Sequence, residues 1–93
     1  MDYIYPYQYS DTQYRQLLQD ELNNNRPIIY RGYGSDGGHA WNIDGYQGDE
    51  FHCNWGWGGY NNGYFPLSTL GGFPGDQAAI IKIQPEDLNI PNI

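Results

Sequence analysis

Residues 37–59 read GGHAWNIDGYQGDEFHCNWGWGG, and this stretch decides the fold. Residues 39–44 and 49–55 alternate apolar and polar side chains, as half-buried strands do. Only the four residues 45–48 separate them, which is a length typical of a hairpin. The stretch therefore predicts two adjacent antiparallel strands, followed by a glycine-rich loop over residues 56–63.

The hairpin also predicts which residues lie opposite one another. With residues 45–48 as the loop, side chains that face each other share one side of the sheet. The predicted partners are Asp44 with Asp49, Trp41 with His52, Ala40 with Cys53, and His39 with Asn54. Cys53 is then expected on the face away from His39. A bulge would shift this pairing by one residue and bring Trp55 opposite His39.

The rest of the chain predicts one helix and further strands around this hairpin. A capping box, Ser10 with Gln13, begins a helix over residues 11–24 whose apolar face carries Tyr14, Leu17, Leu18 and Leu22. Strands are expected over residues 28–33, 63–65 and 77–83, with a glycine-rich loop over 34–38. The predicted fold class is α+β: an N-terminal helix followed by a twisted antiparallel sheet. All 93 residues form one domain, with a core over about 11–84 and a tail or linker over 85–93.

Composition excludes several partners. The chain has 4 basic and 11 acidic residues, so it offers no basic surface for nucleic acids or anionic membranes. The longest apolar run, residues 78–81, is too short to span a membrane. The first residues, MDYIYPYQYS, lack the pattern of a secretory signal. With 10 Tyr and 3 Trp, the core is expected to be aromatic.

A histidine beside an asparagine has one well-known chemical use. In papain-type cysteine peptidases the histidine takes the proton of a thiol, and an amide oxygen accepts the other ring N–H. His39 and Asn54 are candidates for these roles, and Trp55 would shield their hydrogen bond from water. Glycine at position 38 would let a substrate backbone approach closely. The simpler alternative is a half-buried strand histidine capped by Asn54, and the residues alone leave both open.

The same stretch closely resembles the histidine half of the streptopain family of bacterial cysteine peptidases. The family pattern is Gly-His-Ala, then Ile-Asp-Gly, then Asn-Trp-Gly-Trp-Gly-Gly, then Gly-Tyr/Phe-Phe. These motifs match residues 38–40, 43–45, 54–59 and 63–65. The resemblance extends over about residues 11–85 and includes Arg26-Pro27-Ile28-Ile29 after the helix. It implies the β-rich half of a papain-like fold.

The resemblance also implies a set of site residues. His39 matches the catalytic histidine, and Asn54 and Trp55 match the pair that orients and shields it. Gly38 matches a residue whose backbone helps bind substrate, and Trp57 matches a wall of the cleft. The nucleophile has no match, because in such chains the cysteine precedes the histidine by about 130–150 residues. Only 38 residues precede His39 here.

The remaining candidates are expected to be structural. Cys53 is the single cysteine, which excludes an internal disulfide, and its apolar neighbours suggest a buried packing residue. His52 is expected as an exposed or half-buried strand residue. His39, His52 and Asp44 lack the spacing of metal ligands, so neither a metal nor another cofactor is expected.

The resemblance predicts that the chain is a fragment of a streptopain-like cysteine endopeptidase. The isolated chain is then inactive, and its partners are a peptide or protein substrate and a missing N-terminal segment that bears the cysteine. Trp55, Trp57 and Tyr60 would border an open cleft and promote self-association. A secreted or cell-surface location is implied. The alternative is a non-catalytic peptide- or protein-binding module, or an inactivated peptidase remnant in a larger surface protein.

Overall fold

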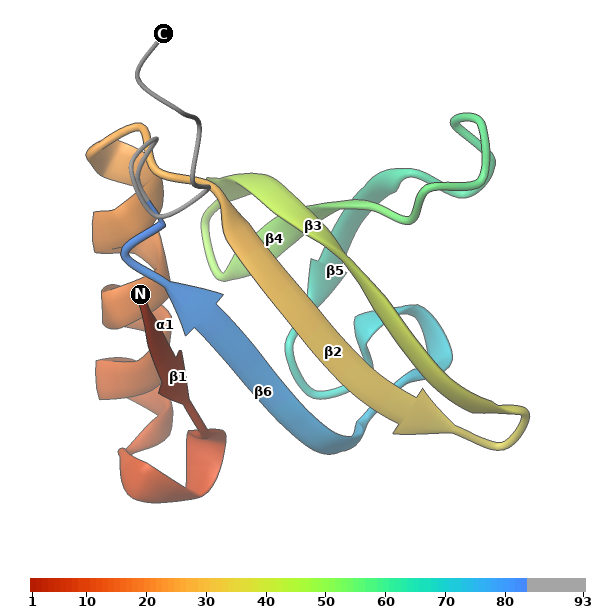
Figure 1. Cartoon of the computed structure of the whole chain (residues 1–93), viewed down its shortest axis with the longest axis horizontal. Helices are drawn as coiled ribbons and strands as arrows, with labels where there is room; N and C mark the ends of the chain where they lie inside the picture. The colour runs from red at the N-terminus through yellow and green to blue at the C-terminus, as the bar shows by residue number, and fades with distance from the viewer. Residues whose placement is uncertain (84–93) are drawn as a thin grey trace, which may run out of the picture.

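The structure, a computed structural model, describes residues 1–83 and consists of one helix against one antiparallel sheet (Figure 1). This confirms the predicted α+β class. The tail predicted over 85–93 lies outside the described residues. The elements in chain order are β1 (Asp2–Ile4), the 3-10 turn η1 (Pro6–Gln8), α1 (Asp11–Asn23), β2 (Ile28–Gly34), β3 (Gly37–Gln47), β4 (Glu50–Asn54), β5 (Gly63–Pro66), the 3-10 turn η2 (Leu70–Gly72) and β6 (Gly75–Ile81).

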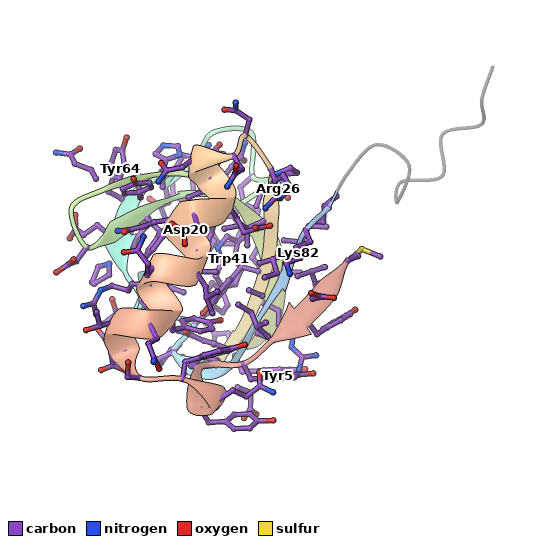
Figure 2. The ribbon with its side chains drawn as sticks, turned by 90° about the vertical axis from the view of Figure 1, so that its left-hand side faces the viewer. Tyr5, Asp20, Arg26, Trp41, Tyr64 and Lys82 are labelled. Carbon is purple, nitrogen blue, oxygen red and sulfur yellow. The ribbon has the colours of Figure 1, made fainter. Side chains whose placement is uncertain are left out.

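The strands lie in the order β1-β6-β2-β3-β4-β5, and every neighbouring pair is antiparallel. β3, which carries His39, therefore lies inside the sheet between β2 and β4. Figure 2 looks onto α1, with the strands behind the helix and Trp41 in the interior. In the described part of the chain, no helix is long and apolar enough to cross a membrane.

The helix forms where its sequence predicts it. The Ser10 hydroxyl accepts the Gln13 backbone N–H at 3.1 Å, and the Gln13 side chain accepts the Ser10 N–H at 3.1 Å. This reciprocal box satisfies two backbone donors that the first turn of a helix leaves free. Tyr14 and Leu18 are buried on the face toward the sheet. Asn25 with φ 57° and the following Pro27 turn the chain into β2.

The loops at both ends of β3 are shorter than predicted. Only Ser35 and Asp36 separate β2 from β3, so the expected loop over 34–38 is a tight hairpin turn. Gly48 and Asp49 separate β3 from β4, where residues 45–48 were expected. Gly48 has φ 61°, which the two-residue turn requires and which glycine adopts without strain. β2 and β3 therefore run further than the sequence pattern suggests.

The shorter turn changes the register of the central hairpin. Asn54 lies opposite Asn42, and Cys53 lies opposite Ile43, so the predicted pairing of His39 with Asn54 is wrong. The pairing of Trp41 with His52 is also wrong, because His52 lies opposite Gly45. The register shifts by one between Ile43 and Gly45, which places a bulge at Asp44. The observed pairing therefore matches neither the register predicted from the sequence nor the alternative shifted by one residue.

The first ten residues contribute more than an extended lead-in. β1 pairs with β6, and Ile4 lies opposite Ala79 and is buried in the core. The core therefore begins upstream of the predicted boundary at residue 11. Pro6 then opens the short turn η1 before the helix.

A buried polar chain ties the helix to the sheet. Tyr14 donates its hydroxyl proton to the Tyr30 oxygen at 3.1 Å, and Tyr30 donates to Gln77 Oε1 at 2.7 Å. The Gln77 amide in turn donates to the Leu67 carbonyl at 2.7 Å. Burial raises the pKa of Tyr14 to about 12 and raises that of Tyr30 further, so both hydroxyls stay protonated as donors.

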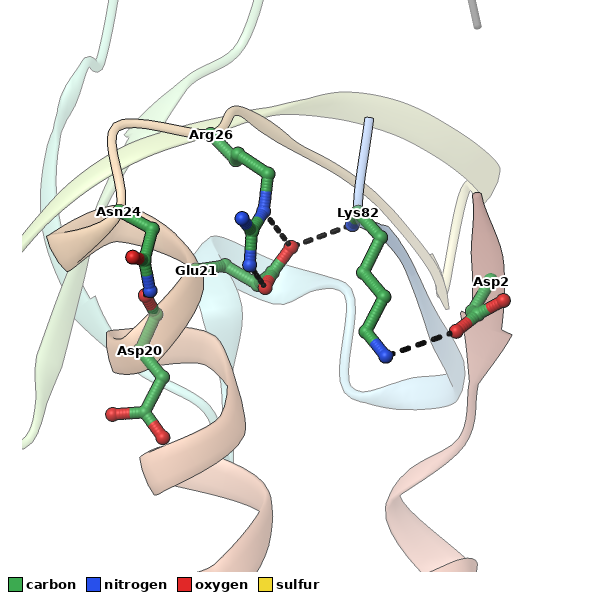
Figure 3. A network of polar contacts seen from close by, with 6 residues as sticks. All are labelled: Asp2, Asp20, Glu21, Asn24, Arg26 and Lys82. Atoms are coloured by element: carbon green, nitrogen blue, oxygen red, sulfur yellow. Dashed lines mark hydrogen bonds and ion pairs between the residues drawn. The ribbon is translucent and has the colours of Figure 1, made fainter. Parts of the chain in front are cut away.

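A buried carboxylate joins four segments at the other end of the helix (Figure 3). Glu21 is 4% exposed and accepts two hydrogen bonds from the Arg26 guanidinium, at 3.1 and 2.7 Å, as well as the Lys82 backbone N–H. The Lys82 ammonium pairs with Asp2 of β1 at 3.5 Å. Arg26 holds the pKa of Glu21 below its usual range, and burial opposes this only in part. Glu21 therefore connects α1 with the segment before β2, through Arg26, and with the residue after β6, Lys82.

We expect Glu21→Gln to lower the melting temperature at neutral pH by several degrees. A carboxyl whose pKa is lowered by folding contributes stability above its ordinary pKa, and this stability is lost as the pH falls through the lowered value. The difference from the wild type should therefore narrow in acid. Thermal unfolding followed by circular dichroism across this pH range measures it. Asp20→Asn, at the exposed neighbouring position, is the control, and an equal loss in both variants contradicts the assignment.

Candidate active site

His39 lies near the start of β3, half-buried against a cluster of aromatic rings. Its ring centroid is 5.0 Å from that of Trp57, 5.8 Å from that of Trp41 and 5.5 Å from that of Phe73. Gly32 on β2 lies opposite His39, and a side chain there would collide with the Phe73 carbonyl. Glycine at position 32 thus lets the segment before β6 pack against the strand that carries the histidine.

One ring nitrogen of His39 is fixed. Nε2 lies 2.9 Å from the backbone oxygen of Trp55. A carbonyl oxygen only accepts hydrogen bonds, so Nε2 must carry the proton and donate it. In the neutral ring Nδ1 then holds the lone pair, which makes it the nitrogen that can accept a proton from another group.

Trp55 is held at three points, which fixes the carbonyl that binds His39. Its backbone N–H donates to Asn62 Oδ1 at 3.1 Å, and its indole N–H donates to the Asn61 carbonyl at 2.9 Å. Its indole is 2% exposed and packs on Trp41 with ring centroids 4.6 Å apart. The sequence analysis missed Asn61 and Asn62. The Asn-Asn pair in a glycine-rich loop could have indicated a tight turn here. Asn61 has φ 61°, a conformation that asparagine tolerates.

Asn54 does not lie next to His39. It faces Asn42 on the opposite side of the sheet from the His39 ring, and its side-chain oxygen accepts the Gly56 N–H at 3.2 Å. The atom that binds the imidazole is therefore the backbone oxygen of Trp55. This hydrogen bond between Asn54 and Gly56 closes a tight turn around Trp55 and so helps to hold the Trp55 carbonyl in place.

The two residues expected to bind substrate lie on different sides of His39. Trp57 stacks against the imidazole and is 43% exposed, so it continues the aromatic wall to the surface. Gly38 pairs with Tyr33, whose ring occupies the space that a side chain at Gly38 would need. Gly38 and His39 also line a shallow hollow of about 440 Å³ along β2 and β3.

Cys53 is buried, as predicted, but its face was predicted wrongly. It lies opposite Ile43, on the face of β3 that also carries Trp41 and His39. Ile43 and His39 are four residues apart, which is about 13 Å along a strand, so the thiol is far from the imidazole. Burial raises the pKa of Cys53 to about 12, and the contact with Trp41 offsets this only in part. Cys53 is therefore a packing residue with almost no thiolate at neutral pH.

His52 is half-buried on the outer face of β4, in agreement with the prediction. Its Nδ1 lies 2.6 Å from Asp44 Oδ1, and the edge of its ring meets Tyr64 at a centroid distance of 4.9 Å. Among the described residues, no three His, Cys, Asp or Glu side chains lie close enough together to hold a metal ion.

An antiparallel sheet that presents a histidine with one fixed ring nitrogen, set in a wall of indoles, is a site of the kind used by papain-like cysteine peptidases. Comparison with known proteins agrees. The Peptidase C10 family matches residues 1–65, and the chain belongs to this family. The fold also matches the structure of active wild-type interpain A cysteine protease from Prevotella intermedia, with a TM-score of 0.76, 34% identity and coverage of 84% of this chain and 36% of that one.

Two curated relatives are much longer than this chain. Streptopain of Streptococcus pyogenes is 40% identical over an alignment 89 residues long, and the match covers 83% of this chain and 22% of streptopain. The thiol protease/hemagglutinin PrtT of Porphyromonas gingivalis is 39% identical over an alignment 93 residues long, and the match covers 87% of this chain and 11% of PrtT. The chain thus spans about a fifth or less of these relatives.

We expect Cys53 to resist thiol reagents in the folded chain. A pKa near 12 lowers the thiolate fraction at neutral pH by roughly a thousandfold relative to a free cysteine, and burial slows access further. Labelling with a chromogenic disulfide, with and without denaturant, measures this difference. Cys53→Ser serves as the blank. Labelling of the folded chain at the rate of a free thiol contradicts the assignment.

Proposed function

We propose that this chain supplies the catalytic histidine of a streptopain-like cysteine endopeptidase. The observation that carries the proposal is the hydrogen bond from His39 Nε2 to the Trp55 carbonyl, because it leaves Nδ1 as the proton acceptor. Membership of the Peptidase C10 family supports a hydrolytic role. The nucleophile comes from a segment outside this sequence, since the one cysteine present is buried and protonated.

In this reaction His39 acts first as base and then as acid. Nδ1 takes the proton of the nucleophilic thiol, and the thiolate attacks a peptide carbonyl of the substrate. His39 then gives that proton to the leaving amine as the acyl-enzyme thioester forms. Water attacks the thioester, with His39 again taking a proton, and releases the acid product and the thiol.

The neighbouring residues keep His39 ready for both steps. The Trp55 carbonyl fixes the tautomer and the plane of the imidazole, and the buried indole of Trp55 excludes water from this side. Asn54 acts on the turn that presents this carbonyl. Trp57 forms one wall of the substrate cleft, and the backbone at Gly38 lies where an extended peptide can approach His39.

The missing segment and the substrate meet the chain beside His39. Trp57 is 43% exposed and Tyr60 is 69% exposed, and such apolar surface usually marks an interaction site. Trp55, which was expected to be part of this open surface, is buried. We propose that the cysteine-bearing segment covers these exposed rings, that the isolated chain self-associates through them, and that the enzyme acts outside the cell or at its surface.

We expect the isolated chain to show no peptidase activity, because His39 has no thiol within reach to activate. Supplying the cysteine-bearing part of a relative such as streptopain in trans should produce binding, measured by calorimetry, and hydrolysis of a fluorogenic peptide. His39→Ala should bind equally well without restoring hydrolysis. Hydrolysis by the isolated chain that is abolished by Cys53→Ser contradicts the proposal. Binding of peptides without any hydrolysis in the complemented enzyme favours the non-catalytic module.

In a complete enzyme that contains this chain, His39→Ala should abolish turnover, while Asn54→Ala and Trp55→Ala reduce it. General-base catalysis contributes about 10²–10⁴-fold in addition to activation of the nucleophile. Trp55→Ala keeps the backbone carbonyl that binds His39 but loses the indole N–H bond that holds it, and Asn54→Ala loses the bond to the Gly56 N–H. Loss of such a supporting bond is worth about 1–3 kcal/mol, or roughly 5- to 150-fold in rate. The measurement is kcat/KM at a matched folded fraction. If His39→Ala keeps more activity than Asn54→Ala, the assignment fails.

A further inference from the structure

Asp44 is the extra residue of β3. Ile43 lies opposite Cys53 and Gly45 lies opposite His52, so no residue of β4 remains to pair with Asp44. An extra residue of this kind rotates the strand and changes which side chains point to a given face. Asp44 itself is half-exposed on the outer face of the sheet.

The bulge lets both halves of β3 contribute to one core. On the turn side of the bulge, Tyr46 lies opposite Phe51, and their rings pack at a centroid distance of 6.3 Å. On the other side, Ile43 and Trp41 are buried. Tyr46 and these two residues have different parity along the strand, so a regular strand would send one set outward.

The same bulge decides where Trp55 lies. If the pairing of Gly45 with His52 continued without a bulge, Trp55 would lie opposite Asn42, on the other face of the sheet from Trp41 and His39. With the bulge, Trp55 comes to the side of Trp41, and its carbonyl reaches His39 Nε2. The hydrogen bond that fixes the imidazole therefore requires the bulge at Asp44.

A side-chain hydrogen bond spans this bulge. His52 Nδ1 lies 2.6 Å from Asp44 Oδ1, and a carboxylate only accepts, so Nδ1–H is the donor. The bond joins the unpaired residue of β3 to the residue of β4 at which the register changes. Tyr64 on β5 lies with its ring edge-on to the imidazole and covers it from the next strand.

We propose that Asp44 and His52 are positioning residues that hold the bulge in place and so keep the Trp55 carbonyl on His39. That this carbonyl serves catalysis rests on the proposed function, whereas the positioning itself is a property of the chain. Loss of the Asp44–His52 bond frees the hairpin to exchange with the register in which Trp55 and His39 lie on opposite faces of the sheet. His39 then loses its acceptor and with it the fixed tautomer.

Two variants of equal shape at position 52 test this proposal. His52→Asn keeps an N–H donor where Nδ1 lies, and His52→Leu replaces that donor by a methyl group. The readout is nuclear magnetic resonance of the 93-residue chain above the titration range of histidine. The chemical shifts of the ring nitrogens give the His39 tautomer. Hydrogen exchange gives the exchange ratio, which is the exchange rate of His39 Nε2–H divided by that of the backbone amide of Tyr30 on strand β2. Neither quantity depends on peptidase activity, so failure of the proposed function is seen separately.

We expect His52→Leu to raise this exchange ratio by at least about tenfold and to mix the His39 tautomers, and His52→Asn to stay within about twofold of the wild type. Glu21→Gln, which destabilises the fold without touching the bulge, should leave the ratio unchanged and so separates positioning from stability. An unchanged ratio in His52→Leu overturns the proposal, as does an equal rise in His52→Asn. If His52→Leu does not fold, Asp44→Ala, which removes the acceptor at a half-exposed position, is judged by the same criteria.

Discussion

The hydrogen bond between His39 Nε2 and the Trp55 carbonyl depends on the register of one hairpin, and that register depends on a single extra residue. The side-chain period of a strand is two, so one unpaired residue exchanges its two faces. At Asp44 this exchange allows β3 to pack Tyr46 against the core near its end and to bury Trp41 in its middle. Packing and site geometry are thus set by the same irregularity.

The site is built by backbone atoms more than by side chains. Trp55 presents its carbonyl to His39 because Asn62 holds its N–H and the Asn61 carbonyl holds its indole. A backbone acceptor has no rotamers to order, so less conformational entropy is lost than with a flexible amide side chain. The aromatic rings of Trp41 and Trp57 then stack against the imidazole.

Local pattern predicted most of the fold, since the capping box at Ser10, the helix face and the alternation along β2 act over short distances. The register failed because it depends on where the turn lies, and Gly45 and Gly48 are equally suited to one. The turn expected at residues 45–48 paired Asn54 with His39, whereas the observed turn and bulge pair Asn54 with Asn42, and Trp55 provides the acceptor. A bulge itself leaves no mark in an alternating pattern. Motif resemblance named His39 and Trp57 without knowledge of the register, and the structure places their rings 5.0 Å apart.

The polar groups that anchor the sheet differ from those that hold His39. β2 is anchored at its Ile28 end by Glu21, which gathers Arg26 and the Lys82 backbone, and in its middle by the chain of hydrogen bonds through Tyr30. Among the described residues, the His39 end of the sheet has no such buried ion pair. It has stacked rings, and Trp55 is held there by the side-chain oxygen of Asn62 and the backbone oxygen of Asn61. A charged group placed there would add its field to the imidazole and to any thiolate beside it, and would shift the proton balance between them. Rings and neutral amides fix position without adding charge. The buried ion pair that anchors the sheet is therefore separate from the uncharged groups that hold His39.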